Sequence, residues 1–396
     1  MSQKPGSLFG GILLTAGSCI GAGMLALPIV TGLAGFFPSL LLFFLAWLFM
    51  TLTGLLLVEV TGTFSHQVNM NSMMARTLGK WGQIASWFLY LFLFYSLLVA
   101  YISGSGSLVS GVFPISTWQA SIFFVILFGT IVLFGTRQVD LWNRVLMGCK
   151  IVAFLSMVFL SFRYLQPTLL LHRNTSYMWL ALPILVVSFG FHNMVPSLTA
   201  YMKGDLKRVR LTILGGSLLT LVIYLIWQIL ILGIVPIDGE FGIAQSAHLG
   251  REASISLAGT LGTSWMGGFG QAFAFFAILT SFLGQTLSLV HFLADAFKVK
   301  HEKHESIFLS LLALGPPLLF SLFSPGLFLK ALSFAGGWAA ILFGIFPVCM
   351  VWIGRYRKQV HTPYRVCGGK PLLIAIFLFS IFITGYQVFL MVSPRV

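Results

Sequence analysis

The stretch Gly17-Ser18-Cys19-Ile20-Gly21-Ala22-Gly23-Met24-Leu25-Ala26-Leu27-Pro28 lies within the first long apolar run of the chain. Three glycines and a proline in twelve positions weaken a helix where a membrane span ordinarily carries Leu and Val. Irregular backbone at membrane depth is tolerated only where it is buried in protein or lines a wet cavity. Interrupted helices of this kind bind substrate in transporters. Small residues at this spacing also let two helices pack closely, so this stretch alone leaves both interpretations open.

The whole chain has the composition of a helical membrane protein. Of its 396 residues, 58% are hydrophobic and only 8% are charged. Runs of about 20 apolar residues recur along it, which is the length of a transmembrane helix. Barrel strands would instead be alternating runs of about 10 residues. The four cysteines show no CxxC spacing, so neither a disulfide framework nor a zinc site is predicted, and we expect no metal and no cofactor.

Eleven apolar runs are candidate spans, and together they define an all-α integral membrane protein. The formal net charge is +14, but the basic residues form short clusters between the runs, which is the positive-inside pattern rather than a nucleic-acid stripe. This pattern predicts a cytoplasmic N-terminus and, with an odd number of spans, a periplasmic C-terminus. We expect the first run to be a retained helix rather than a cleaved signal. The candidate spans are 8–30, 35–62, 83–111, 118–135, 142–164, 177–200, 210–235, 266–295, 306–323, 328–352 and 371–392.

A second interruption occurs in the sixth span, at Ser188-Phe189-Gly190-Phe191-His192-Asn193-Met194-Val195-Pro196-Ser197-Leu198. It lies five spans after the first, and an odd offset places the two halves of the chain inverted in the membrane. Matching Gly/Pro-interrupted spans in two halves point to the binding site of an inverted-repeat transporter. We therefore predict one transporter domain over 1–396, with repeats at about 8–164 and 177–352 and an extra helix at 371–392.

Two loops are long enough to hold structure. Residues 64–82, which are rich in Met and carry Arg76 and Lys80, predict a short interfacial helix on the cytoplasmic side. Residues 236–264 either fold over an external mouth or form a plain solvated loop.

The two interrupted spans, together with Phe134-Gly135-Thr136-Arg137-Gln138-Val139-Asp140-Leu141-Trp142-Asn143-Arg144, resemble the hydroxy and aromatic amino acid permeases. Within that family the sequence is most similar to the tyrosine- and tryptophan-specific permeases of bacterial inner membranes. The family belongs to the amino acid-polyamine-organocation superfamily, and the likeness extends over essentially the whole chain. It implies a five-plus-five inverted repeat with broken helices 1 and 6 and an appended eleventh helix. It also implies import of an aromatic amino acid, usually driven by the proton gradient.

An amino acid substrate needs a site for its carboxylate and a site for its ammonium group. Half-helix amides at the first break can hold the carboxylate without an arginine, and the candidates are Ser18, Cys19, Ile20, Gly21, Ala22 and Gly23. Unwound carbonyls at Ser188, Phe189 and Gly190 can hold the ammonium group. The hydroxyls of Ser18 and Ser188 can alternatively bond back to their own helices.

Aromatic side chains near the breaks are candidates for the side-chain pocket. Phe189 and Phe191 flank the second break, although the chain has 39 Phe and most face lipid. Tyr95 and Tyr101 on the third span are stronger candidates, because a buried hydroxyl needs a partner. His192 either exchanges protons near neutral pH or is a structural, hydrogen-bonded histidine.

Lys150 is the strongest candidate for ion coupling, because a lysine inside an apolar span is costly unless it is neutral, paired or wet. In some proton-coupled relatives of this fold, a lysine on the fifth helix occupies the place of a sodium ion, and Lys150 resembles that arrangement. Its alternative is to snorkel to the interface. Thr280 and Ser281 match positions of sodium ligands in sodium-coupled relatives. Glu59 either pairs with a basic residue such as Lys150 or Arg76, or reaches the headgroups.

The sequence thus predicts a secondary transporter in the bacterial inner membrane that imports tyrosine or tryptophan with a proton by alternating access. We expect it to function as a monomer in the lipid bilayer, with no nucleic-acid partner. A sodium-coupled or exchange-type amino acid transporter is the alternative. An intramembrane enzyme would show paired carboxylates or histidine clusters at one depth, and a channel would show rings of charge or filter carbonyls.

Overall fold

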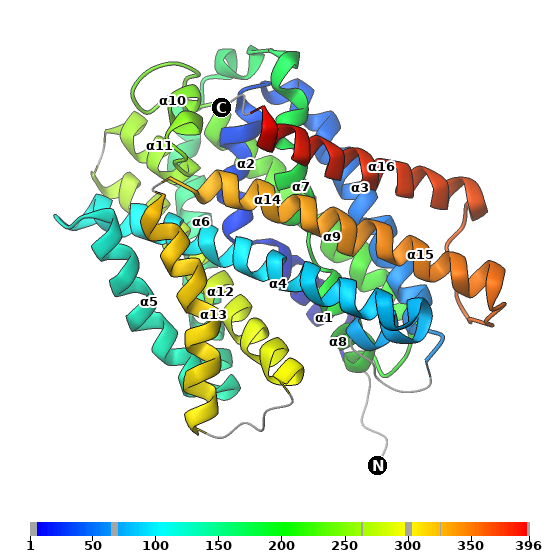
Figure 1. The fold of residues 1–396 in the computed structure, drawn as a ribbon. Helices are drawn as coiled ribbons and strands as arrows, with labels where there is room; N and C mark the ends of the chain where they lie inside the picture. Colours follow the sequence, from blue (N-terminus) through cyan, green and yellow to red (C-terminus); the bar gives the residue numbers. More distant parts are fainter. Residues whose placement is uncertain (1–5, 65–69, 263, 298–302, 325, 394–396) are drawn as a thin grey trace.

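The chain folds into a helical bundle in the computed structural model, which describes residues 6–64, 70–262, 264–297, 303–324 and 326–393 (Figure 1). Those ranges contain helices and connecting loops but no strand. The α-helices are α1 Leu8–Cys19, α2 Ala22–Gly32, α3 Phe36–Thr61, α4 Met70–Val112, α5 Thr117–Leu133, α6 Thr136–Ser161, α7 Leu182–Ser188, α8 Val195–Tyr201, α9 Leu206–Leu232, α10 Ile243–His248, α11 Ala253–Leu261, α12 Ser264–Phe297, α13 Lys303–Phe323, α14 Phe328–Ala340, α15 Phe346–Trp352 and α16 Gly369–Val392. Short 3₁₀ segments include η4 (His192–Met194), and α14 and α15 continue into π-helical turns at η5 (Ile341–Ile345) and η6 (Ile353–Arg357).

The spans agree with the predicted class of protein. In the described ranges, eight helices are long and apolar enough to cross a membrane, and the bent pair of α1 and α2 makes a ninth span. Two shorter apolar helices, Thr117–Leu133 and Ile307–Phe323, coincide with the remaining predicted spans. The predicted number of eleven is compatible with this arrangement.

The first predicted interruption is present as a sharp break. Helices α1 and α2 meet at 58°, and Ile20 and Gly21 lie between them. Pro28 inside α2 has no N–H, so the carbonyl of Met24 loses its helical donor. The indole Nε1 of Trp227 on α9 donates to that carbonyl at 2.9 Å instead. The break is therefore held by α9 rather than left open.

The second interruption is also present and lies beside the first. Helix α7 ends at Ser188, and the chain resumes helical structure only at η4 and α8. The hydroxyl of Tyr224 on α9 lies 2.7 Å from the carbonyl oxygen of Cys19 and 2.7 Å from that of Ser188. One O–H group is thus shared between the last carbonyls of the two half-helices. The predicted broken helices 1 and 6 are confirmed.

The other helices form the framework around this junction. Helix α1 packs on α9, α2 on α7, α6 on α12, and α14 on both α4 and α7. Helix α16, drawn red in Figure 1, lies along α14 at the periphery of the bundle, as expected of an appended helix.

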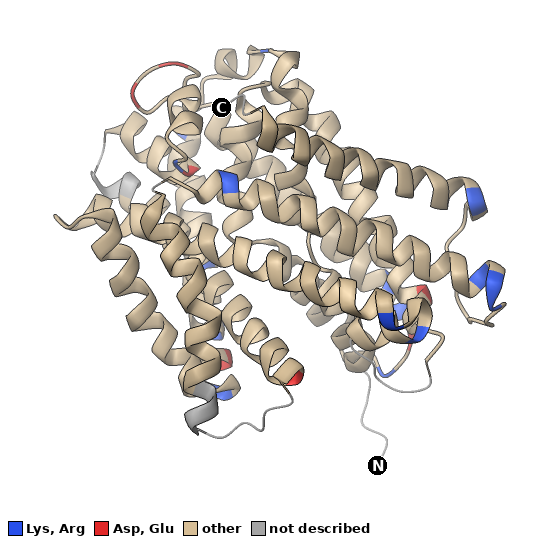
Figure 2. Cartoon of the chain, in the orientation of Figure 1, with Lys and Arg blue, Asp and Glu red and all other residues tan. Residues whose placement is uncertain are grey.

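Charged residues gather at the helix ends (Figure 2). Arg210, Arg355, Lys358 and Lys370 lie at the end of the bundle where α3 and η6 end and where α9 and α16 begin. We call this the basic end. Helix α4 also starts near this end, and it bends at Gly79, where φ is +77°. The segment from Met70 to Leu78 is therefore a separate short helix inside the predicted range 64–82, while residues 65–69 lie outside the described residues.

The opposite end is covered by residues 236–262 of the predicted loop 236–264. Helices α10 and α11 pack against α2, and α11 also packs on α12. Glu252 caps α11 by accepting from the backbone N–H groups of Ser254 and Ile255 at 2.7 and 3.1 Å. The segment is a folded cover, so the interpretation as a plain solvated loop is wrong.

Candidate functional site

A cavity of about 390 Å³ lies where the two broken helices meet. Its wall brings together residues from α1, α2, α4, α6, α7, η4, α12, α14 and η5. The predicted site residues in this wall are Ser18, Cys19, Ile20, Gly21, Ala22, Gly23, Tyr101, Lys150, Ser188, Gly190, Thr280 and Ser281. Both breaks and three of the four coupling candidates, Lys150, Thr280 and Ser281, therefore face one space, whereas Glu59 does not.

The start of α2 faces the cavity with its amide groups. Gly21 is the N-cap in an extended conformation, and the N–H of Ala22 donates to the hydroxyl of Ser281 at 3.3 Å. The first N–H groups of a helix have no intrahelical acceptor and carry the positive end of its dipole. Gly23 is at the second helical position, and a Cβ there would lie 2.6 Å from the hydroxyl oxygen of Ser188 and 3.4 Å from its Cα. Glycine at this position lets the two breaks touch.

Lys150 on α6 points into the protein and toward the first break. Its side chain is buried, with 3% exposed, and its Nζ donates to the carbonyl of Ile20 at 2.7 Å. The geometry differs from that of a snorkelling lysine, whose ammonium group would lie at the membrane surface. The side-chain nitrogen of Lys150 therefore bonds to a carbonyl that lies in the break between α1 and α2.

Two hydroxyl side chains of α12 face the same region. Thr280 donates to the carbonyl of Phe276 at 2.9 Å, and Ser281 donates to that of Ala277 at 2.9 Å. Both oxygens keep lone pairs, and that of Ser281 accepts from Ala22.

The serines of the two breaks bond back to their own helices, which is the alternative stated for them above. The hydroxyl of Ser18 donates to the carbonyl of Thr15 at 2.8 Å, and that of Ser188 donates to Ile184 at 2.7 Å. The carbonyl of Ser188 accepts from Tyr224, as described above, and that of Phe189 accepts from the N–H of Phe191 at 3.1 Å. Two of the three carbonyls predicted to bind an ammonium group thus already have donors.

Several predicted side chains lie outside the cavity wall. The Tyr95 hydroxyl donates to the carbonyl of Leu312 on α13 at 2.9 Å, so it faces away from the breaks. Phe189 is buried edge-on against Tyr224, with ring centroids 5.1 Å apart. A Cβ added at Gly54 on α3 would clash with the ring of Phe191, at 2.5 Å, so that ring packs on α3. These three residues pack the framework and do not line this cavity.

His192 is likewise a packing residue rather than a wall residue. It is fully buried, and its Nε2 lies 2.8 Å from the hydroxyl oxygen of Thr53 on α3. Its ring is stacked between those of Phe191 and Phe343, at 4.9 and 4.7 Å between centroids. Its contacts are those of the structural, hydrogen-bonded histidine.

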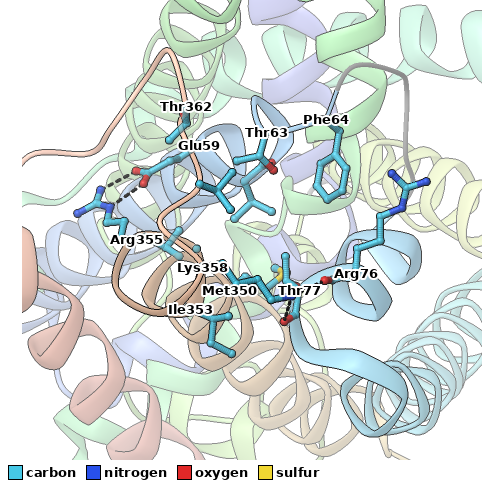
Figure 3. A pocket seen from close by; sticks show the side chains of 14 residues that line it. Glu59, Thr63, Phe64, Arg76, Thr77, Met350, Ile353, Arg355, Lys358 and Thr362 are labelled. Atoms are coloured by element: carbon cyan, nitrogen blue, oxygen red, sulfur yellow. Dashed lines mark hydrogen bonds and ion pairs between the residues drawn. The ribbon is translucent and has the colours of Figure 1, made fainter.

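Glu59 lies at the basic end and is paired with Arg355 (Figure 3). The carboxylate accepts two hydrogen bonds from the guanidinium, each 2.6 Å long. The N–H of Val366 donates to the same carboxylate, and the carbonyl of Val366 accepts from Arg355, both at 2.8 Å. The predicted pairing with a basic residue is present, but the partner is Arg355 rather than the suggested Lys150 or Arg76. Glu59 joins α3 to η6 and to the loop before α16, away from the cavity wall.

A second pocket, of about 190 Å³, adjoins this ion pair (Figure 3). Its wall includes Glu59, Arg355, Phe64, Arg76 and Lys358. The ammonium group of Lys358 donates to the carbonyl of Arg76 at 2.9 Å, which ties η6 to the short helix before Gly79.

Sequence reasoning missed several residues that shape the site. Tyr224 and Trp227 tie α9 to the breaks, and Asn193, Phe343 and Gln285 belong to the cavity wall. A tyrosine and a tryptophan three residues apart within one apolar span were an available signal, because both need hydrogen-bond partners when buried. No pattern in the sequence distinguishes Phe343 from the other phenylalanines.

The fold has a solved counterpart of almost the same extent. The chain is similar to the crystal structure of MhsT in complex with L-phenylalanine, with a TM-score of 0.67 over 98% of this chain and 99% of that one. Sequence identity is 15%, so the likeness concerns the fold alone.

Sequence comparison places the chain in a class of membrane transporters. It is 34% identical over 386 residues to "Tyrosine-specific transport system 1" of Haemophilus influenzae, covering 95% of each chain. It is 31% identical to the "Tryptophan-specific transport protein" of Shigella flexneri, covering 96% of this chain and 94% of the other. Residues 4–387 match the tryptophan/tyrosine permease family, and the chain belongs to that family.

Proposed function

We propose that this protein is a secondary active transporter that imports tyrosine or tryptophan across the bacterial inner membrane together with a proton. The observation that carries the proposal is the cavity at the junction of two half-helices, with the ammonium group of Lys150 bonded to the break. Membership of the tryptophan/tyrosine permease family and the names of its relatives support the choice of an aromatic amino acid.

The substrate backbone is assigned to the two breaks. The N–H of Gly23 and the positive end of the α2 dipole suit the carboxylate. Tyr101, whose hydroxyl lies beside that of Ser281, is the second candidate donor in the same wall. The ammonium group is assigned to the second break at Gly190, whose neighbours Ser188 and Phe189 already accept hydrogen bonds. No acidic side chain is present in the described wall, so the backbone supplies the negative partial charge.

Proton coupling is assigned to Lys150. When protonated, its ammonium group holds the carbonyl of Ile20 and braces α1 against α6. On loss of the proton the charge disappears, this bond weakens, and α1 is free to move relative to α6 and α12. A sodium ion bound by Ile20, Thr280 and Ser281 would share the carbonyl of Ile20 with the ammonium group of Lys150, and like-charge repulsion would exclude the ion.

The conformation is assigned as inward-facing, with the basic end toward the cytoplasm. The cavity wall continues from the breaks to Leu13 on α1, Asn143 on α6 and Ser288 on α12. Leu13 is 48% exposed, although it lines the cavity. The other end is covered by α10 and α11, so the substrate leaves toward the basic end in this state.

The test is uptake of radiolabelled tyrosine and tryptophan by proteoliposomes that contain the purified protein. A proton gradient alone is expected to drive accumulation, and a sodium gradient alone is not. Lys150→Gln is expected to abolish gradient-driven accumulation while tyrosine binding stays measurable, because Lys150 contacts the break rather than the substrate. Lys207→Gln, which removes an exposed lysine at the basic end, is the matched control and should transport normally.

Three outcomes contradict parts of the proposal. Absence of aromatic amino acid transport under every gradient removes the proposed substrate class. Accumulation driven by a sodium gradient alone refutes the proton as the coupling ion and favours Thr280 and Ser281 as sodium ligands. Unchanged uptake by the Lys150→Gln protein refutes the proposed role of Lys150 in proton coupling.

A further inference from the structure

We call the part of the cavity wall that α4, η4 and η5 contribute the ring end. It consists of Leu93, Leu97 and Tyr101 on α4, Asn193 and Met194 on η4, and Phe343 on η5. Phe343 is held in place because its other face stacks on His192 at 4.7 Å, with 15° between the ring planes. Aromatic rings prefer such stacked or edge contacts. The rigid backing makes Phe343 a fixed surface on which an aromatic side chain can pack.

One polar side chain of this wall is oriented by a hydrogen bond from behind. The hydroxyl of Tyr90 on α4 donates to Oδ1 of Asn193 at 3.0 Å. Tyr90 is buried, with 5% exposed, and its ring packs against Phe94 and Phe343. Asn193 is itself exposed to the cavity. Since Oδ1 is engaged, the amide group presents its Nδ2, which bonds to none of the described residues.

The rest of this end offers a ligand little other polarity. Among the wall residues from α4, η4 and η5, only Asn193 and Tyr101 have polar side chains. Asn143 and Gln285 lie in the wall formed by α6 and α12, but their side-chain oxygens are themselves buried and unpartnered. Those two acceptors are therefore not presented to a molecule in the cavity. Nδ2 of Asn193 is a hydrogen-bond donor at the ring end of the site.

A donor at this position distinguishes among aromatic side chains. A phenol oxygen accepts hydrogen bonds, whereas an indole N–H only donates and a phenyl ring does neither. We infer that Asn193, oriented by Tyr90, makes the site selective for a phenol, so that tyrosine is preferred over phenylalanine and tryptophan. This inference rests on the proposed function. A site built to bond a polar group rejects an analogue that leaves the group unpaired.

The test measures inhibition of radiolabelled tyrosine uptake by unlabelled tyrosine, phenylalanine and tryptophan. The unmodified protein is expected to bind tyrosine about tenfold more tightly than phenylalanine, which is the value of one buried hydrogen bond. In Asn193→Leu that preference should disappear. In Asn193→Asp the donor becomes an acceptor, so the affinity for tryptophan should rise relative to that for tyrosine.

Tyr90→Phe tests the orienting bond without altering a wall residue. The amide of Asn193 is then free to rotate and to present Oδ1 to an indole N–H, so the tyrosine-to-tryptophan preference should fall. Tyr95→Phe is the matched control, because it makes the same change on the same helix and its hydroxyl bonds to Leu312 instead. Its preferences should equal those of the unmodified protein.

The inference is overturned if the unmodified protein prefers tryptophan, or if the tyrosine-to-phenylalanine ratio is the same in Asn193→Leu. It is also overturned if Tyr90→Phe and Tyr95→Phe have equal preferences. In each of these cases the proposed function stands, since aromatic amino acids are still transported. Failure of the unmodified protein to transport any of the three overturns both. Should Asn193→Leu fail to fold, the substrate preferences of Asn193→Asp and Tyr90→Phe decide whether the inference holds.

Discussion

The ion pair of Glu59 and Arg355 offers a sharp test of how the basic end is held together. Both side chains are buried, with 3% and 7% exposed, and the backbone of Val366 bonds to both, since its N–H donates to Glu59 and its carbonyl accepts from Arg355. Glu59→Gln keeps the shape of the side chain but removes its charge. The guanidinium of Arg355 then stays buried without a counter-charge, and the Gln amide directs a donor group toward other donors.

The expected cost follows from the loss of one partner of a buried pair, which is about 3–5 kcal/mol. At about 1.4 kcal/mol for each factor of ten, the unfolding equilibrium should shift by roughly 10² to 10⁴. Replacing both partners, in Glu59→Gln with Arg355→Met, removes the stranded charge. The double variant should therefore be more stable than Glu59→Gln alone, although it carries one more substitution.

The assay is equilibrium unfolding of the purified protein in mixed detergent micelles, which gives the free energy of unfolding for each variant. Asp140→Asn is the control, because Asp140 and Arg144 form an exposed pair on α6, with 57% and 77% of their side chains exposed. That change should cost about 0–0.5 kcal/mol. A Glu59→Gln protein as stable as the control would refute the reasoning, and so would a double variant in which the two losses simply add.

Three other predictions concern the junction and its cover. Burial raises the pKa of Glu252 from 4.5 to about 7. The stability that the protonated carboxyl contributes is therefore complete below about pH 4.5 and is lost as the pH rises toward 7. In Glu252→Gln, the free energy of unfolding should no longer fall over this pH range. Tyr224→Phe leaves two carbonyls at the breaks without their shared donor and should cost about 1–3 kcal/mol, with weaker tyrosine binding in equilibrium dialysis. Gly23→Ala should abolish uptake, because the added Cβ would lie 2.6 Å from the hydroxyl oxygen of Ser188. Gly17→Ala is the control and should transport normally, because the nearest atom to its added Cβ belongs to Met147, at 3.4 Å. Equal uptake by the two variants would contradict the packing argument.

The breaks and the class of fold were predictable because their causes are local. Glycine and proline weaken a helix wherever they occur, and runs of about 20 apolar residues identify spans without any knowledge of their neighbours. Matching breaks five spans apart then indicated which backbone segments meet. The cavity wall contains both of them, together with Lys150.

The side-chain pocket was less predictable, because these helices are apolar on all sides and their sequence does not mark an inward face. Tyr95 and Tyr101 lie on one helix, yet only Tyr101 lines the cavity. The partner of Glu59 lies 296 residues away, and no local pattern indicates such a pair. Tyr224 and Asn193 acquire their positions from packing between α9, α4 and the breaks, which sequence periodicity does not describe.

The central claim, a proton-coupled transporter for an aromatic amino acid, is tested most directly by one measurement. Proteoliposomes that contain the purified protein are given radiolabelled tyrosine, with a proton gradient imposed in sodium-free buffer. We expect accumulation above equilibrium, its collapse when an uncoupler dissipates the proton gradient, and no accumulation with Lys150→Gln. Accumulation that ignores the proton gradient and follows an imposed sodium gradient would refute proton coupling.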